Sequence, residues 1–173
     1  MSLEHLTEAD LEPLAFHTLR LSVVKKFCNP LSCWPELEGK PITPAEVDTC
    51  LAAGEEALRN TPSWILLATS RRDISLEEAR QRHIQKIAYF VKHSALSPIC
   101  LDVTEGFGYP VEDGNHRLAG AILRGDRTIR AKVAGPADRA QAMGLWNPTA
   151  EAEELLRRWL APPPSRRKPS GPR

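Results

Sequence analysis

The stretch Glu-Asp-Gly-Asn-His-Arg at residues 112–117 separates a short strand pattern from a helical one. Gly114 allows a tight turn, and the segment 115–124, ended by Gly125, has the pattern of a short helix. The first turn of a helix presents unpaired N–H groups at the positive end of the helix dipole. Such a turn attracts anions before any side chain is counted, so it is the first candidate for a binding site.

The side chains of this turn suit phosphate chemistry. Arg117 can hold a phosphate through two parallel hydrogen bonds, and His116 can donate a hydrogen bond or move a proton. Glu112 and Asp113 are carboxylates, which suit Mg²⁺ or a general base. We therefore expect a nucleotide or nucleic-acid phosphate at residues 114–117, with these four side chains as catalytic candidates and Asp113 or Glu112 as the metal ligand.

A plainer interpretation gives the turn no ligand. Asp-Gly-Asn is common turn chemistry, and Asp113 or Asn115 could simply cap the following helix. Arg117 could pair with a surface carboxylate. The order of strands and helices on either side of the turn is therefore needed to choose between the two interpretations.

Working outward from the turn, apolar periodicity predicts a series of strands and helices. Ser75 with Glu78 three residues later has the pattern of a capping box, and Thr43-Pro44 is a typical helix start. The expected helices are 43–59, 75–93, 115–124, 136–143 and 149–160. The expected strands are 16–27, 64–69, 98–103, 109–112 and 128–133, with a turn at 106–108. This order predicts a mixed α/β fold, with a small mixed sheet packed by helices.

The chain of 173 residues suits one ordinary domain. We expect an N-terminal extension at residues 1–61, holding the helix at about 43–59, and a nucleotide- or DNA-binding domain at 62–160. Residues 161–173 are rich in Pro and basic side chains, and we expect this tail to be disordered.

Composition excludes several classes of protein. The formal net charge is only +1, so the total charge shows no strongly basic nucleic-acid binder, but the last 13 residues hold four basic side chains and no acidic one. We find no apolar run long enough for a membrane helix and no secretory signal. The four cysteines form no Cys-x-x-Cys pair, so we expect reduced thiols in a cytoplasmic protein. A zinc site built on Cys28 and Cys33 with His17 is the alternative.

Other basic side chains could contact the same ligand. At 100° per residue, Arg82 and Lys86 share one flank of the helix 75–93. This flank could line the phosphate side of a pocket, and a solvated flank is the alternative. Arg80 and His83 fall within the apolar stripe of that helix. We expect His83 to be a core histidine, whereas Arg80 must either extend to solvent or reach into the site, because an unpaired buried Arg is costly.

A second basic group is a candidate for DNA. If the apolar side chains of the strand 128–133 face inward, Arg130 and Lys132 face outward together and could contact a DNA backbone. The tail could add to this attraction. The expected DNA-binding residues are Arg130, Lys132, Arg166, Arg167 and Lys168. A solvated surface is the alternative.

The order of five elements resembles the ParB/sulfiredoxin superfamily over about residues 64–135. These elements are a helix, the strand Pro-Ile-x-Leu-x-Val, a strand ending in Asp-Gly-Asn-His-Arg, a helix ending in Arg-Gly-Asp, and Ile-x-Ala-x-Val. In sulfiredoxins the Gly-x-His-Arg turn holds a nucleotide phosphate and x is the reactive cysteine. The resemblance implies that the helix 75–93 packs beside this turn, with the flank of Arg82 and Lys86 at the phosphate. Here x is Asn115, which excludes sulfinic-acid repair. In chromosome-partition proteins the turn reads Gly-Glu-Arg-Arg, so only Arg117 matches, and the DNA-binding helix-turn-helix domain that follows there has no room here.

Within the superfamily, the chain resembles short plasmid-borne members of the oncogenic-suppression (Osa) type, which inhibits fertility. This resemblance implies hydrolysis of ATP with Mg²⁺ or another divalent cation, cleavage of DNA, and a block on transfer of a rival plasmid or T-DNA through a type IV secretion channel. The coupling protein of that channel would be a partner. The location would be the bacterial cytoplasm, with recruitment to the inner membrane through the partner. Two alternatives stay open: a non-catalytic module that binds DNA or a partner, and a kinase acting on a small molecule such as serine.

Overall fold

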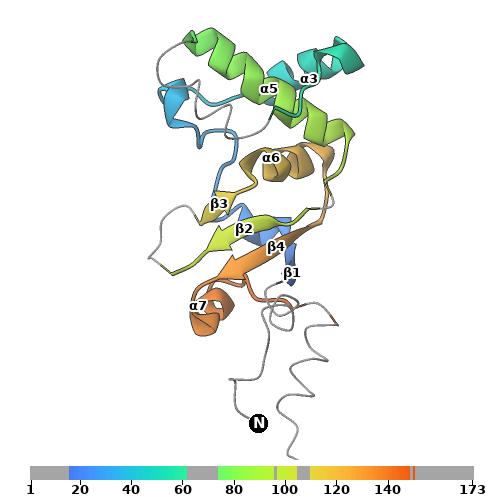
Figure 1. The fold of residues 1–173 in the computed structure, drawn as a ribbon. Coiled ribbons are helices and arrows are strands. Elements are labelled where there is room, and N and C mark those ends of the chain that lie inside the picture. Colours follow the sequence, from blue (N-terminus) through green and yellow to red (C-terminus); the bar gives the residue numbers. More distant parts are fainter. Residues whose placement is uncertain (1–15, 62–73, 96, 105–109, 149, 151–173) are drawn as a thin grey trace, which may run out of the picture.

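The computed structural model describes residues 16–61, 74–95, 97–104, 110–148 and 150. These residues form a mixed α/β fold, which confirms the fold class predicted from the sequence (Figure 1). The four-stranded sheet has the order β1-β4-β2-β3. Its strands are β1 (Phe16–Arg20), β2 (Ile99–Asp102), β3 (Val111–Asp113) and β4 (Thr128–Ala134). The central pair β2 and β4 is parallel, and both edge strands pair antiparallel to their neighbours.

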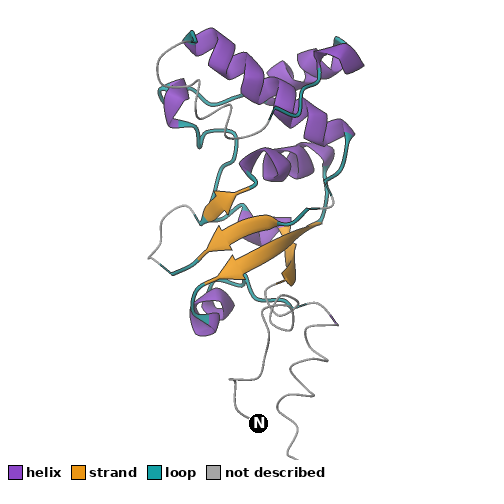
Figure 2. Cartoon of the chain, in the orientation of Figure 1, coloured by secondary structure: helices purple, strands orange, loops and turns teal. Residues whose placement is uncertain are grey.

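Most of the helical residues lie to one side of the strands. Figure 2 shows α6 beside the sheet, α5 and α3 beyond it, and α7 on the other side of the strands. The helices are α2 (Leu21–Val24), α3 (Pro44–Ala52), α5 (Leu76–Lys92), α6 (Asn115–Arg124) and α7 (Ala137–Ala142), with 3-10 turns η3 (Pro35–Leu37) and η4 (Glu55–Ala57). No helix in the described ranges is both long and apolar enough to cross a membrane.

Local signals placed several helix ends correctly. Helix α6 begins after Gly114 and ends before Gly125, as predicted. Thr43 caps α3 through a full capping box with Glu46. Ser75 Oγ accepts the Glu78 N–H at 3.2 Å at the start of α5, whereas the Glu78 carboxylate pairs with Arg82.

Three predicted elements differ in length. The expected strand 16–27 ends at Arg20, because Leu21 and Val24 are buried three residues apart on the short helix α2. The expected helix 43–59 ends at Ala52, because the backbone turns at Gly54, whose φ is 93°. Strand β3 begins at Val111 and continues to Asp113. The predicted elements 64–69, 106–108 and 149–160 and the tail 161–173 lie outside the described residues.

The described part of the expected N-terminal extension shares the core of the fold. Strand β1 pairs with β4, and Leu19 and Val24 pack in one buried cluster with side chains of the sheet, α6 and α7. Trp34 and Val47 belong to a second cluster, between α3, α5 and the segment around η3. These 46 residues, 16–61, therefore help to position α5 and α6. The expected domain boundary after residue 61 stays a prediction.

Gly120 sets how closely α6 packs against α5. A Cβ atom at this position would lie 2.7 Å from Phe90 Cβ and 2.8 Å from the Phe90 carbonyl carbon. The absence of a side chain therefore lets the two helix backbones approach directly. This contact brings the middle of α5 to the first turn of α6.

Arg80 holds the start of α3 against α5, so neither of the two expectations for this residue is correct. Its Nε lies 2.7 Å from Glu46 Oε1, and its Nη2 lies 2.7 Å from Glu46 Oε2. The same guanidinium donates to the carbonyl oxygens of Lys40 at 3.1 Å and Pro41 at 2.7 Å. The hydrogen bond from Arg80 is the main cause that lowers the pKa of Glu46 to about 2.

We expect Arg80→Ala to lower the free energy of unfolding at pH 7 by about 2 kcal/mol, since it removes two hydrogen bonds to the Glu46 carboxylate and two to backbone carbonyl oxygens. The folded-state pKa of Glu46 lies below its unfolded value, so this ion pair stabilises the protein above about pH 4. That contribution is lost as the pH falls towards 2. The difference in the free energy of unfolding between wild type and variant should therefore become smaller at low pH. Urea unfolding at pH 7 and pH 3 measures both effects.

Arg82→Ala is the matched control, because Arg82 forms an i,i+4 pair with Glu78 on the same helix. Such pairs contribute about 0.5 kcal/mol or less. Equal losses for the two variants at pH 7 would contradict a structural role for the Arg80 network.

Candidate phosphate site

Gly114 makes the turn between β3 and α6 possible. Its φ of 99° and ψ of 19° lie in the left-handed region, which favours glycine. A Cβ atom here would lie 2.7 Å from Ile99 Cγ2 and 3.1 Å from Ile99 Cα, so the turn also packs directly on β2. Gly114, which has no side chain, occupies the N-cap position of α6. Asp113 and Asn115, the residues that the plainer interpretation of the sequence offered as caps, lie on either side of it.

A pocket of about 530 Å³ opens at this turn. Lys86 of α5 and Arg117 of α6 border it, together with the first turn of α6. The full lining comprises Asn60, Lys86, Phe90, Ala95, Ser97, Asp113, Gly114, His116 and Arg117. Two cationic side chains and a helix N-terminus thus surround one space, which is an arrangement suited to an anion.

Lys86 is the most unusual residue of this pocket. Its side chain comes from an apolar part of α5, and the residue is only 5% exposed. Burial lowers the pKa of its amine, while the nearby Asp113 carboxylate opposes that shift. A buried ammonium group is costly, and a bound anion would offset part of that cost.

Arg117 already has partners within the protein. Its Nη2 donates to Asp113 Oδ2 at 2.6 Å, and its Nη1 donates to the carbonyl oxygen of Pro98. The pairing with a carboxylate is what the plainer interpretation of the sequence expected. The guanidinium nevertheless borders the pocket, so a ligand would bind next to an ion pair that is already in place.

His116 points into a buried network that the sequence did not reveal. Its Nε2 lies 2.8 Å from His83 Nδ1, and His83 Nε2 lies 2.8 Å from Glu36 Oε1. The Trp34 ring lies 4.6 Å from the His83 ring and 5.1 Å from the His116 ring, measured between centroids. His83 is buried as expected, but it connects η3 to α6. Glu36 and Trp34 lie in a Pro-rich segment, and no pattern in the sequence indicated that they belong to the site.

A smaller pocket of about 270 Å³ is lined by the turn and by the segment around η3. Glu112 borders this pocket, whereas Asp113 and His116 border both. The four predicted catalytic residues therefore do not all line one pocket. Glu112 is absent from the pocket that Lys86 and Arg117 border. Asp113 is thus the one carboxylate of the turn that borders the pocket together with Lys86 and Arg117, and its Oδ2 accepts from Arg117 Nη2 at 2.6 Å.

The structure also locates the other side chains that were predicted as ligands of phosphate or metal. Arg82 pairs with Glu78 and lines neither pocket at the turn. Within the part of the chain that the structure describes, no cluster of three or more His, Cys, Asp or Glu side chains could hold a metal ion. The four cysteines, all within the described ranges, form no disulfide bond. The Cys28 thiol donates to the Val24 carbonyl oxygen at 3.2 Å, and burial raises its pKa to about 11.

The predicted DNA-binding side chains on β4 lie together. Arg130 and Lys132 share one side of the strand, while Ala131 and Val133 are buried on the other. Both cations lie over the Phe16 ring, at 5.5 Å for Arg130 Cζ and 4.9 Å for Lys132 Nζ from its centroid. The tail residues Arg166, Arg167 and Lys168 lie outside the described residues.

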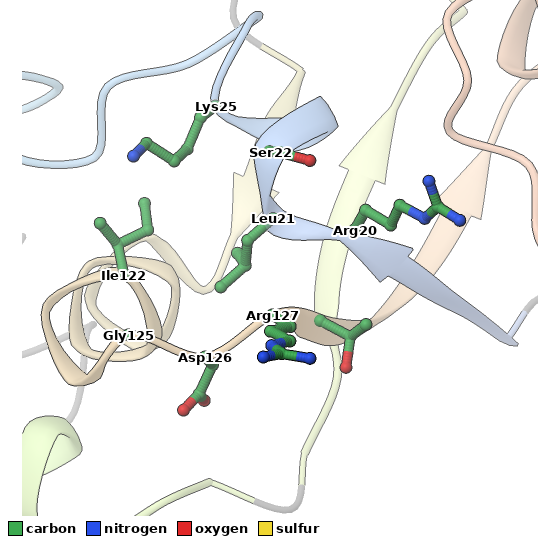
Figure 3. Close-up of a pocket in the computed structure, with 9 residues that line it drawn as sticks. Arg20, Leu21, Ser22, Lys25, Ile122, Gly125, Asp126 and Arg127 are labelled. Carbon is green, nitrogen blue, oxygen red and sulfur yellow. The ribbon is translucent and has the colours of Figure 1, made fainter.

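A separate pocket of about 560 Å³ lies between α2 and the end of α6. Figure 3 shows Leu21, Lys25 and Ile122 around it, with Arg127 below and Arg20 pointing away. Sequence reasoning missed it because its lining comes from two segments far apart in the sequence, within residues 20–25 and 122–128. Its cations are exposed, in contrast to the buried Lys86.

No protein-family model matches this sequence, and neither a curated protein nor a solved structure matches it. Function is therefore inferred from the geometry around Gly114.

Proposed function

We propose that the pocket at the N-terminus of α6 binds the phosphates of a nucleotide, with ATP and Mg²⁺ as the first candidate. The observation that carries this proposal is the placement of Lys86, Arg117 and the first turn of α6 around one pocket of about 530 Å³. Two cations offset phosphate charge, and the backbone N–H groups of the turn supply directed hydrogen bonds. Asp113 would hold the metal ion that accompanies the nucleotide.

The same arrangement suits hydrolysis of a phosphoanhydride or a phosphodiester. Both reactions build negative charge around phosphorus, and fixed cations and N–H groups stabilise that charge. We accordingly propose nucleoside triphosphatase activity, with cleavage of DNA as a second reaction of the pocket. The paired cations Arg130 and Lys132 would attract the DNA backbone.

The order of elements supports a place in the ParB/sulfiredoxin superfamily. Helix α5, strands β2 and β3, helix α6 and strand β4 follow one another as that resemblance requires. Within this proposal the protein is a plasmid-type inhibitor of fertility. It would act in the bacterial cytoplasm on a type IV secretion channel, through the coupling protein of that channel.

Calorimetry with ATP and Mg²⁺ tests the proposal, using wild type and Arg117→Ala. We expect the wild type to bind and the variant to bind about 10- to 100-fold more weakly, since a charged hydrogen bond contributes about 1.5–3 kcal/mol. Arg130→Ala, on the outward side of β4, is the control that should bind ATP like the wild type. A folded wild type that binds no nucleotide would remove the basis of the proposal. Where ATP binds, release of phosphate and cleavage of plasmid DNA are then measured.

A non-catalytic binding module is the second candidate. The observation in its favour is that Arg117 and His116 are already bonded within the protein, to Asp113, Pro98 and His83. If Arg117→Ala loses nucleotide binding but still blocks plasmid transfer, the protein inhibits transfer by binding a partner, without need of the nucleotide. Deleting residues 1–42 would not separate the two candidates, because that deletion removes β1 and part of both buried clusters.

A further inference from the structure

Glu36, His83 and His116 form a continuous chain of hydrogen bonds that ends at the phosphate pocket. The chain crosses three elements, since Glu36 belongs to η3, His83 to α5 and His116 to α6. Each of its two bonds measures 2.8 Å. Both rings are buried, and the Trp34 ring packs on them.

The carboxylate fixes the protons on both rings. An ionised carboxylate only accepts hydrogen bonds, so His83 carries its proton on Nε2. In a neutral imidazole the other nitrogen is then an acceptor, so His83 Nδ1 accepts from His116 Nε2–H. By the same rule, His116 Nδ1 holds a lone pair. The chain therefore specifies which nitrogen of His116 can take up a proton.

The surroundings keep both rings neutral near pH 7. Burial is the main cause that lowers the pKa of His83 and, more strongly, that of His116. The charged groups that face His116 are Lys86 of α5 and Arg117 of α6, which lower its pKa further. Asp113 lies at the same pocket wall. Glu36 raises the pKa of His83 and partly offsets the effect of burial.

His116 contributes to the wall of the phosphate pocket as well as to the hydrogen-bond chain. Among the described residues, the one buried side-chain nitrogen or oxygen without a hydrogen-bond partner is His17 Nε2. The bond to His83 uses His116 Nε2, and His116 Nδ1 is not among such enclosed atoms. His116 is 9% exposed, and it borders both pockets at the turn.

We propose that Glu36 and His83 orient His116 so that its Nδ1 accepts the proton of the water that attacks a bound phosphate. This inference rests on the proposed nucleotide site. Neither carboxylate of the turn replaces His116 in this role, because Asp113 is bonded to Arg117 and Glu112 borders the other pocket. His116 is the catalytic residue, and Glu36 and His83 are positioning residues.

The step balances without a further reactant. The water oxygen forms a bond to phosphorus while one of its protons passes to His116 Nδ1. The bond from phosphorus to the leaving oxygen breaks, and its electron pair stays on the nucleoside diphosphate. The imidazolium that forms is stabilised by His83 Nδ1 and, through His83, by Glu36. The proton then leaves His116 for solvent.

Nitrogen-15 spectra of the histidine rings test the relay on the full-length protein without ligand. We expect both His83 and His116 to be neutral at pH 7 and protonated on Nε2. A proton on Nδ1 of either ring would overturn the relay whatever the protein hydrolyses.

Kinetics of ATP hydrolysis test the catalytic role, with Glu36→Gln as the variant and Glu38→Gln, two residues away and exposed, as its control. We expect Glu36→Gln to lower kcat about 10- to 100-fold while the Kd for ATP changes less than twofold. Loss of the carboxylate charge makes His116 a weaker base, so the fall in kcat at low pH should move to lower pH. Glu38→Gln should change neither quantity.

The outcomes separate the inference from the proposed function. No binding of ATP by the folded wild type overturns both. Binding of ATP without hydrolysis, or hydrolysis whose kcat and pH profile Glu36→Gln leaves unchanged, overturns the relay and leaves the phosphate site standing. If Glu36→Gln fails to fold, His83→Phe, which keeps a ring of similar shape, replaces it with the same expected loss of kcat.

Discussion

Gly114→Ala is expected to lower the free energy of unfolding by about 3 kcal/mol or more, combining backbone strain with overpacking. The backbone at Gly114 has a φ of 99°, and an added Cβ would come within 2.7 Å of Ile99 Cγ2 and 3.1 Å of Ile99 Cα. Ile99 is fully buried in the central strand β2, so it cannot move aside. The turn would have to lift away from the sheet, and the pocket would open with it.

Gly125→Ala isolates the strain from the overpacking. Gly125 has a similar φ of 81°, but no atom lies within 4 Å of an added Cβ. We expect a loss of about 1 kcal/mol there, the cost of a left-handed backbone for alanine. Urea unfolding at pH 7 compares the two variants. If Gly114→Ala is no less stable than Gly125→Ala, the packing of the turn on β2 is not as described.

Lys86→Met is expected to weaken ATP binding about 10- to 100-fold without lowering the stability of the free protein. The amine of Lys86 borders the pocket from a residue only 5% exposed, and burial lowers its pKa. Burial of an ammonium group costs free energy, and an apolar side chain of similar length avoids that cost. The affinity for ATP should therefore fall, while the free energy of unfolding stays the same or rises.

Lys92→Met supplies the matched control for Lys86→Met. Lys92 lies on the same helix, but its side chain is 50% exposed and pairs with Glu55. Calorimetry and urea unfolding on both variants separate a ligand-binding lysine from a structural one. A Lys86→Met protein that binds ATP like the wild type, or that loses more than about 2 kcal/mol of stability, would contradict a binding role.

The sequence predicted best the features that depend on neighbouring residues. The ends of α6 follow from the left-handed glycines Gly114 and Gly125, and the start of α3 follows from Thr43 and Glu46. These signals act within four residues, so no knowledge of the tertiary fold is needed.

The features that the sequence could not predict depend on contacts between residues far apart in the chain. The Glu36–His83 bond joins residues 47 apart, and the Arg80–Glu46 pair joins residues 34 apart. Arg82 and Lys86 illustrate the same limit. They share a helix flank in the sequence pattern, but only Lys86 faces the turn, because Gly120 sets where α6 crosses α5.

The most direct test of the central claim is the location of the nucleotide. Backbone amide signals are followed by NMR while ATP and Mg²⁺ are added to the full-length protein. We predict that the largest changes occur at residues 114–117 and at Lys86. Changes centred instead on residues 20–25 and 125–128, which line the pocket of Figure 3, would contradict the phosphate site at Gly114, as would the absence of any change.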